Sequence, residues 1–151
     1  MTEEFAYDSL NRLTEAAIVD GLTKTFAYDS IGNITTKSDV GSYSYPTSGS
    51  SSVRPHAVSS ITGTVNGITN PSFTYDANGN LTAGLGRTVT WTSYNMVATV
   101  ARGTNTLAFT YDSDHQRIKQ YVSGTDERTI YINGAVRAEK LVNGTTGNLI
   151  R

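Results

Sequence analysis

The stretch FTYDANGNLT (Phe73 to Thr82) decides the fold of this chain. Phe73 and Tyr75 are two residues apart, so they share one face of an extended strand. Asp76 can cap a turn by accepting hydrogen bonds from backbone N–H groups two residues on. Gly79 suits a positive φ, as in a hairpin whose type I turn is followed by a bulge, and the return strand then begins at Leu81. These ten residues therefore predict one β-hairpin.

The same pattern recurs along the chain, and recurrence at a near-constant spacing is the signature of a repeat architecture. A degenerate copy with a Ser/Gly loop occupies residues 42–56, which we interpret as a surface excursion inside one domain spanning residues 1–151. Tyr131 lies 20 residues after Tyr111 and extends the run. The other copies are FAYDSLNRLT (5–14), FAYDSIGNIT (26–35) and two worn ones, VTWTSYNMVA (89–98) and FTYDSDHQRI (109–118).

An aromatic third residue, an Asp fourth residue and a Gly seventh residue define the repeat. The seventh place holds only residue types that tolerate a left-handed backbone, so we predict a positive φ at most of these positions. The seventh-place residues are Asn11, Gly32, Gly79, Asn95 and His115. The repeat-defining structural residues are Tyr7, Asp8, Tyr28, Asp29, Gly32, Tyr75, Asp76, Gly79, Trp91, Tyr111 and Asp112.

A second class of turn alternates with the first. Asx-Gly between apolar strand residues is the strongest short-range hairpin signal. It occurs at Asp20-Gly21, Asn66-Gly67, Asn133-Gly134 and Asn143-Gly144. Two alternating turn types predict a continuous antiparallel meander, and no segment has a convincing helical period. The expected fold is all-β, a twisted antiparallel sheet of stacked hairpins.

Composition excludes several classes of function. A net charge of −1 and a pI near 6.1 leave no basic footprint for nucleic acid. No apolar run approaches the ~20 residues that span a bilayer. The amino-terminal residues MTEEFAYD show no signal peptide. The absence of cysteine rules out disulfides and thiolate metal sites.

Few residues suggest chemistry. We expect His115 to be a turn residue and His56 to lie structurally at the start of a strand, because two histidines without clustered carboxylates make a poor zinc site. The recurring Asp residues could suggest a calcium ladder, but one carboxylate per turn favours capping. Gly84-Leu85-Gly86 lacks the context of a phosphate loop. The acid pairs Glu3-Glu4 and Asp126-Glu127 are interpreted as solvated charge. We therefore predict no enzyme, no cofactor and no metal.

The aromatic third positions (Tyr7, Tyr28, Tyr75, Trp91 and Tyr111) should form a ladder across adjacent hairpins. Packing between strands is the favoured interpretation, because aromatic neighbours stabilise sheets by about 0.2–1 kcal/mol per pair. The alternative is a stacking platform for sugars or peptides. Buried aromatics would favour packing, and a row of exposed ones would favour binding.

YDxxGNxT with a preceding aromatic, recurring at about 20 residues, resembles the YD-repeat of the Rhs, teneurin and insecticidal toxin-complex families. Arg54-Pro55-His56-Ala57-Val58, the copies at 73–82 and 109–118, and Thr90-Trp91 are similar to bacterial Rhs proteins near the carboxyl end of their repeat region. The resemblance implies an open strip of a spiralling β-shell that encloses a toxin or effector domain. It implies a non-catalytic segment of a larger bacterial protein, secreted or at the cell surface.

The implied partners are the rest of the parent shell and its enclosed toxin. Unpaired sheet edges also predict self-association with another copy. A glycan- or receptor-binding surface module is the alternative function. An autoproteolytic piece is a weaker third one, because the motifs that the family uses for cleavage are not visible here.

Overall fold

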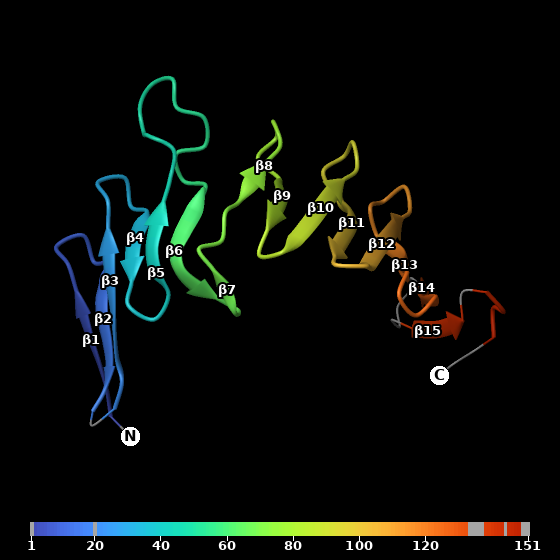
Figure 1. The fold of residues 1–151 in the computed structure, drawn as a ribbon, viewed down its shortest axis with the longest axis horizontal. Coiled ribbons are helices and arrows are strands. Elements are labelled where there is room, and N and C mark those ends of the chain that lie inside the picture. Colours follow the sequence, from blue (N-terminus) through green and yellow to red (C-terminus); the bar gives the residue numbers. More distant parts are fainter. Residues whose placement is uncertain (1, 20, 133–137, 144, 149–151) are drawn as a thin grey trace. The chain divides into compact units, whose positions relative to one another are not determined.

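The computed structural model describes residues 2–19, 21–132, 138–143 and 145–148. These residues form strands and turns with no helix, which confirms the all-β prediction. They divide into two compact units, Met1–Phe73 and Thr74–Arg151, called the first unit and the second unit below. Each unit carries one antiparallel sheet (Figure 1).

The sheet of the first unit has its strands in chain order. They are β1 (Glu3–Tyr7), β2 (Leu13–Ile18), β3 (Thr23–Tyr28), β4 (Ile34–Lys37), β5 (Gly41–Ser44), β6 (Ser60–Val65) and β7 (Ile68–Thr69). The sheet of the second unit also follows chain order. Its strands are β8 (Thr74–Tyr75), β9 (Leu81–Gly84), β10 (Arg87–Trp91), β11 (Val97–Arg102), β12 (Asn105–Tyr111), β13 (Arg117–Val122), β14 (Glu127–Ile132) and β15 (Ala138–Asn143).

The prediction of one continuous meander is wrong, because the strands form two sheets of seven and eight strands. The first sheet ends at β7, a strand of only two residues. Asn70 follows β7 with a φ of 49°, and Pro71 then offers no N–H to a ladder. A left-handed residue followed by proline therefore interrupts the extended chain between β7 and β8.

Every recognised copy of the repeat is a hairpin with the predicted bulge. The register shifts immediately before the aromatic third residue in all five copies. In the first copy Tyr7 pairs with Leu13 and Ala6 with Glu15, so Thr14 is the extra residue. One backbone geometry is thus repeated along both sheets.

The seventh position adopts a positive φ in all five copies, as predicted. The angles are 58° at Asn11, 91° at Gly32, 89° at Gly79, 60° at Asn95 and 60° at His115. In each copy the N–H of this residue donates to the oxygen of the fourth residue, as Gly79 does to Asp76 at 3.1 Å. The turn and its left-handed exit therefore form one unit.

The second class of turns is confirmed where the structure describes it. Asn66-Gly67 connects paired Val65 and Ile68 with φ values of 49° and 79°, the signs of a type I′ hairpin. The Gly21 N–H donates to the Ile18 oxygen at 2.8 Å. Asp20, Asn133, Gly134 and Gly144 lie outside the described residues. Leu85-Gly86 makes a further two-residue turn between β9 and β10, with φ values of 53° and 69°.

Tyr131 does not continue the series of third-position aromatics. In the regular repeat, the residue that follows a copy pairs with the residue that precedes the next copy. Thr99 follows the fourth copy and pairs with Ala108, and Phe109 then begins the fifth copy. Lys119 follows the fifth copy and pairs with Ile130. Tyr131 therefore takes the first position of a repeat, as Phe109 does, and not the third position. The cause is the turn between paired Val122 and Glu127, which is longer by two residues than the turn between Arg102 and Asn105.

Strand pairing sorts the side chains of each sheet onto two faces. The apolar face of the first unit carries Phe5, Tyr7, Leu13, Ile18, Phe26, Tyr28, Ile34, Tyr43, Ile61, Val65 and Ile68. Mostly threonine, serine and alanine occupy the opposite, small face, for example Thr25, Ala27, Thr36, Ser42 and Thr62. The second unit repeats this division from β8 to β12, with Tyr75, Val89, Trp91, Val100, Leu107 and Tyr111 on its apolar face.

Each sheet is a single layer within its own unit. Strands contact only their neighbours along the chain, as the ribbons of Figure 1 also show for each unit. Among the described residues, the buried apolar side chains are those of Ile61, Pro71 and Val142. Within each unit, the apolar side chains consequently pack against neighbours on the same face of the sheet and not against a second layer.

Candidate functional site

The fourth-position carboxylates cap their own turns, as predicted. Asp76 Oδ1 accepts the N–H of Asn78 and that of Asn80, each at 2.9 Å. Asp8, Asp29 and Asp112 accept the equivalent pair of N–H groups. Thr92 replaces the carboxylate in the fourth copy, and its hydroxyl still accepts the Met96 N–H at 3.0 Å.

These hydrogen bonds favour the ionised carboxylate. The backbone hydrogen bond from Arg12, with the Arg12 side chain, lowers the pKa of Asp8 despite some desolvation. Burial raises the pKa of Asp29, but the hydrogen bonds from Asn33 and Ile31 outweigh it and the pKa is lowered. The recurring aspartates therefore stabilise turns, and their oxygens are already engaged by N–H donors.

In four copies, the degenerate one included, the aromatic third position links the hairpin to the one before it. Its polar group donates to the main-chain oxygen of the ninth residue in the preceding copy. The bonds run from Tyr28 to Leu13 (2.8 Å), Tyr45 to Ile34 (2.9 Å), Trp91 to Leu81 (2.9 Å) and Tyr111 to Val97 (2.8 Å). The predicted ladder is thus a ladder of hydrogen bonds, and it assigns Tyr45 to the third position of the degenerate copy.

A second ladder, at the eighth position, was not anticipated from sequence. Arg12 Nε contacts the Asp8 carboxylate of its own turn at 2.7 Å, while its Nη1 donates to the Asp29 oxygen of the next turn. Asn80 Nδ2 likewise donates to Asp76 and to Asn95 Oδ1, each at 3.0 Å. The eighth position varies in residue type, so no shared residue could have revealed this role. It holds Arg12, Asn33, Asn80, Met96 and Gln116.

The Ser/Gly loop is attached to the second copy by the same device. Buried Asn33 donates through Nδ2 to Asp29 and to the Pro55 oxygen, both at 2.9 Å. His56 Nδ1 lies 2.7 Å from Asn33 Oδ1. His56 therefore lies in the loop before β6 and not at a strand start, and its role there is structural.

The exposure of the third-position aromatics distinguishes packing between strands from a stacking platform for a ligand. Tyr28, Tyr75, Trp91 and Tyr111 are half-buried. Tyr7, on edge strand β1, is 58% exposed and makes no hydrogen bond through its hydroxyl to the described residues. In the first unit the exposed aromatic thus lies on the edge strand, and the third-position aromatics of the second unit are all half-buried.

Other aromatics are exposed at the turns. Tyr94 is 42% exposed and stacks on His115, with ring centroids 4.5 Å apart and planes 5° from parallel. His115 keeps its predicted place as a turn residue, and this stack adds a contact between the turns of the fourth and fifth copies.

The two acid pairs differ. Glu3 and Glu4 are exposed on β1, as expected for solvated charge. Asp126 is half-buried in a turn with a φ of 51°, and hydrogen bonds from Thr145 and then Tyr121 lower its pKa. The interpretation of Asp126 as merely solvated is therefore wrong, since its carboxylate connects two turns.

One apolar cavity of about 370 Å³ lies beside edge strand β1. Its apolar lining includes Phe5, Ile18 and Leu22, with Glu3 and Lys24 among the charged residues around it. Leu22 is 81% exposed, so a large apolar side chain faces solvent here. This cavity and the free edge of β1 form the most exposed apolar part of the first unit.

Within the part of the chain that the structure describes, no three His, Asp or Glu side chains gather into a metal site. Nor do these residues include a helix of the length and hydropathy needed to cross a membrane. No protein-family model matches the chain, and no curated protein matches its sequence.

Proposed function

We propose that this chain is a non-catalytic structural segment of an Rhs-type β-shell, which encapsulates and carries a toxin or effector domain. One observation supports this proposal above others: the polar groups of the third-position aromatics bond adjacent hairpins together. Aromatic side chains that bond neighbouring hairpins in this way hold a sheet together, as the wall of a shell requires. Their polar groups are not available to bind a ligand.

The single-layer sheets support the same proposal. Each unit exposes one apolar face without a second layer of its own. An exposed apolar surface of this kind marks an interaction site, and in a shell it would be covered by neighbouring repeats or by the enclosed domain. The proposed parent is a larger bacterial protein that is secreted or displayed at the cell surface.

A glycan- or receptor-binding module is the second candidate. The exposed stack of Tyr94 and His115 favours it, because aromatic rings at a surface offer a flat contact for sugars or peptides. The two candidates differ in where the essential residues lie. The wall requires the apolar face, and the binding module requires the turns.

The first test is to read the native frame on both sides of residues 1–151. Further YD repeats, followed by a variable terminal domain, are the expected result. The parent protein then permits a functional test, in which Phe26→Asp changes the apolar face and Thr25→Asp changes the small face of the same strand.

In that test the terminal domain should be protected from protease in the wild type and in the Thr25→Asp control. It should become cleavable in Phe26→Asp. A frame without further repeats, or protection unaffected by Phe26→Asp in a folded parent, would remove the shell proposal. Loss of binding to cells on Tyr94→Ala alone would favour the second candidate.

A further inference from the structure

The small face of the second unit changes character at β13. From β8 to β12 it carries threonine and alanine, for example Thr90, Thr99, Ala101 and Ala108. At β13 and β14 the same face carries Lys119, Tyr121, Arg128 and Ile130. A wall needs no such change, so these large side chains call for a separate explanation.

The change coincides with a shallow cavity of about 290 Å³. The residues that line it come from three adjacent strands, β12, β13 and β14. They are Ala108, Thr110, Lys119, Tyr121 and Arg128. Pairing holds them in two rows, Ala108 with Tyr121 and Arg128 in one, and Thr110 with Lys119 in the other. Ligand sites begin at about 300 Å³, so this one suits a single small ring.

Charge at the cavity is positive. Lys119 forms no ion pair with any described residue, and no carboxylate lines the cavity. Arg128 lies over the Tyr121 ring, with its guanidinium carbon 5.7 Å from the centroid. Asp126 attracts Arg128, but its carboxylate also accepts hydrogen bonds from Thr145 and Tyr121. Among the described residues, Lys119 therefore has no anionic partner.

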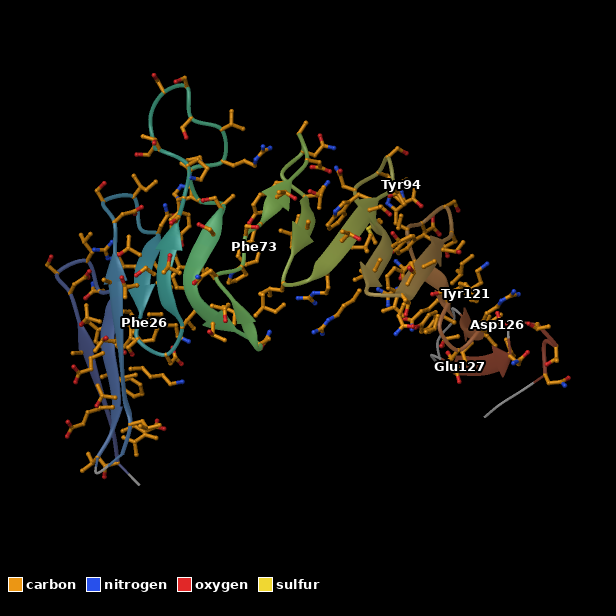
Figure 2. The ribbon with its side chains drawn as sticks, viewed as in Figure 1. Phe26, Phe73, Tyr94, Tyr121, Asp126 and Glu127 are labelled. Carbon is orange, nitrogen blue, oxygen red and sulfur yellow. The ribbon has the colours of Figure 1, made fainter. Side chains whose placement is uncertain are left out.

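The ring of Tyr121 supplies the second element. Tyr121 is half-buried, and Figure 2 places it near Asp126 and Glu127 at the β13–β14 hairpin. A hydrogen bond from its hydroxyl contributes to the lowered pKa of Asp126. Beside it the exposed Thr110 hydroxyl can donate or accept a hydrogen bond. An aromatic surface, a hydroxyl and free positive charge together match a ring that has an apolar surface, hydroxyl groups and one negative charge.

We propose that this cavity, the β12–β14 site, binds an acidic sugar of the uronic acid class. Lys119 and Arg128 pair with its carboxylate, Tyr121 packs against the apolar surface of its ring, and Thr110 bonds one of its hydroxyls. The site goes beyond the wall function and does not depend on it, because the apolar face takes no part.

The test is a titration of the ¹⁵N-labelled full chain with sodium glucuronate, followed by NMR. Glucose and sodium phosphate serve as the neutral and the non-sugar anionic probes. Saturable shifts are expected at Ala108, Thr110, Lys119 and Tyr121 with glucuronate, and much weaker ones with either control. Lys119→Gln should weaken binding about tenfold, as expected for loss of a charged hydrogen bond.

Arg87→Gln is the matched control, because Arg87 lies in the same unit on the opposite face. It should leave the affinity unchanged. Tyr121→Leu tests the ring, and the amide spectrum of each variant establishes that it is folded. Absence of saturable shifts with glucuronate would overturn the proposal. Equal shifts with phosphate would also overturn it, since they would show a site for free anions. Neither result affects the shell proposal.

Discussion

The hydroxyl of Tyr111 donates to the main-chain oxygen of Val97, 2.8 Å away in the preceding hairpin. Tyr28 and Leu13 repeat this relationship in the first unit. Tyr111 lies in β12, which already pairs with β11 of the preceding hairpin. The hydroxyl bond therefore strengthens the contact between these two hairpins at the end where the repeat turns lie.

Tyr111→Phe removes that donor and leaves the ring. We expect the free energy of unfolding to fall by about 0.5–1.5 kcal/mol, the usual net contribution of one hydrogen bond. Urea denaturation followed by circular dichroism measures it. Tyr7→Phe is the matched control, because the Tyr7 hydroxyl bonds no described residue. Equal losses from both substitutions would contradict a structural role for the ladder.

Gly79→Val should destabilise the second unit strongly. The φ of Gly79 is 89°, and a β-branched residue in the left-handed region costs about 1–3 kcal/mol. Gly79→Asn is the control, because Asn11 and Asn95 hold the same place with φ values of 58° and 60°. A melting temperature that is unchanged in Gly79→Val would show that the turn is wrongly assigned.

Gly41 and Gly63 pair directly across β5 and β6. A Cβ on Gly41 would lie 2.1 Å from the Thr62 main-chain oxygen, and the φ of Gly41 is 132°. Gly41→Ala should therefore cost about 1–3 kcal/mol, as overpacking does. Gly49→Ala is the control, since its Cβ would meet no atom within 4 Å. Thermal melts of both variants decide the matter, and similar melting temperatures would exclude the close approach.

The chain should self-associate through β1. All five residues of this edge strand are exposed, and an unpaired edge is a template for another strand. Light scattering at tens of micromolar should give a mass above that of one chain. Glu3→Pro removes an N–H that faces the free edge of β1, because the Thr2–Val19 bond turns the N–H groups of the even-numbered residues towards β2. It should reduce the mass, whereas Ser51→Pro in the loop between β5 and β6 should not. A strictly monomeric wild type would refute this prediction.

Acid should weaken the first unit through Asp39. Hydrogen bonds from Lys24 and then Lys37 lower the pKa of Asp39 from 3.8 to about 2. A depressed carboxyl pKa stabilises the fold above the unfolded value, so this contribution is lost as the pH falls from 3.8 through about 2.

The comparison of wild type with Asp39→Asn tests this effect. The wild type should be more stable at pH 5, and most of the difference should be lost by about pH 2 in urea titrations. The difference at pH 5 should also shrink at high salt, because the ion pairs are exposed to solvent. A difference that persists at pH 2 would assign the effect to something other than charge.

Sequence predicted the hairpin well because its determinants are local. The cap by Asp76, the left-handed Gly79 and the bulge before Tyr75 all lie within ten residues. The cross-bonds at the eighth position were missed, since Arg12 and Asn80 share no residue type and their partners lie in another copy.

Two further features could not be predicted from the sequence, because one depends on a backbone angle and the other on strand pairing. The break after β7 depends on the positive φ of Asn70, a residue type that is equally at home in an ordinary turn. The β12–β14 site depends on pairing across three strands, which brings Lys119 and Arg128 to one cavity. Neither residue belongs to a recognisable motif.

The capping of each turn by its own side chain has an evolutionary consequence. Asp8 Oδ1 caps the first turn and the Thr92 hydroxyl caps the fourth, so a substitution at one cap leaves the capping bonds of the other turns in place. Loss of one cap therefore removes the capping bonds of that copy alone. A lineage can therefore let individual copies drift beyond easy recognition, as the fourth copy has done, while the backbone of each hairpin persists.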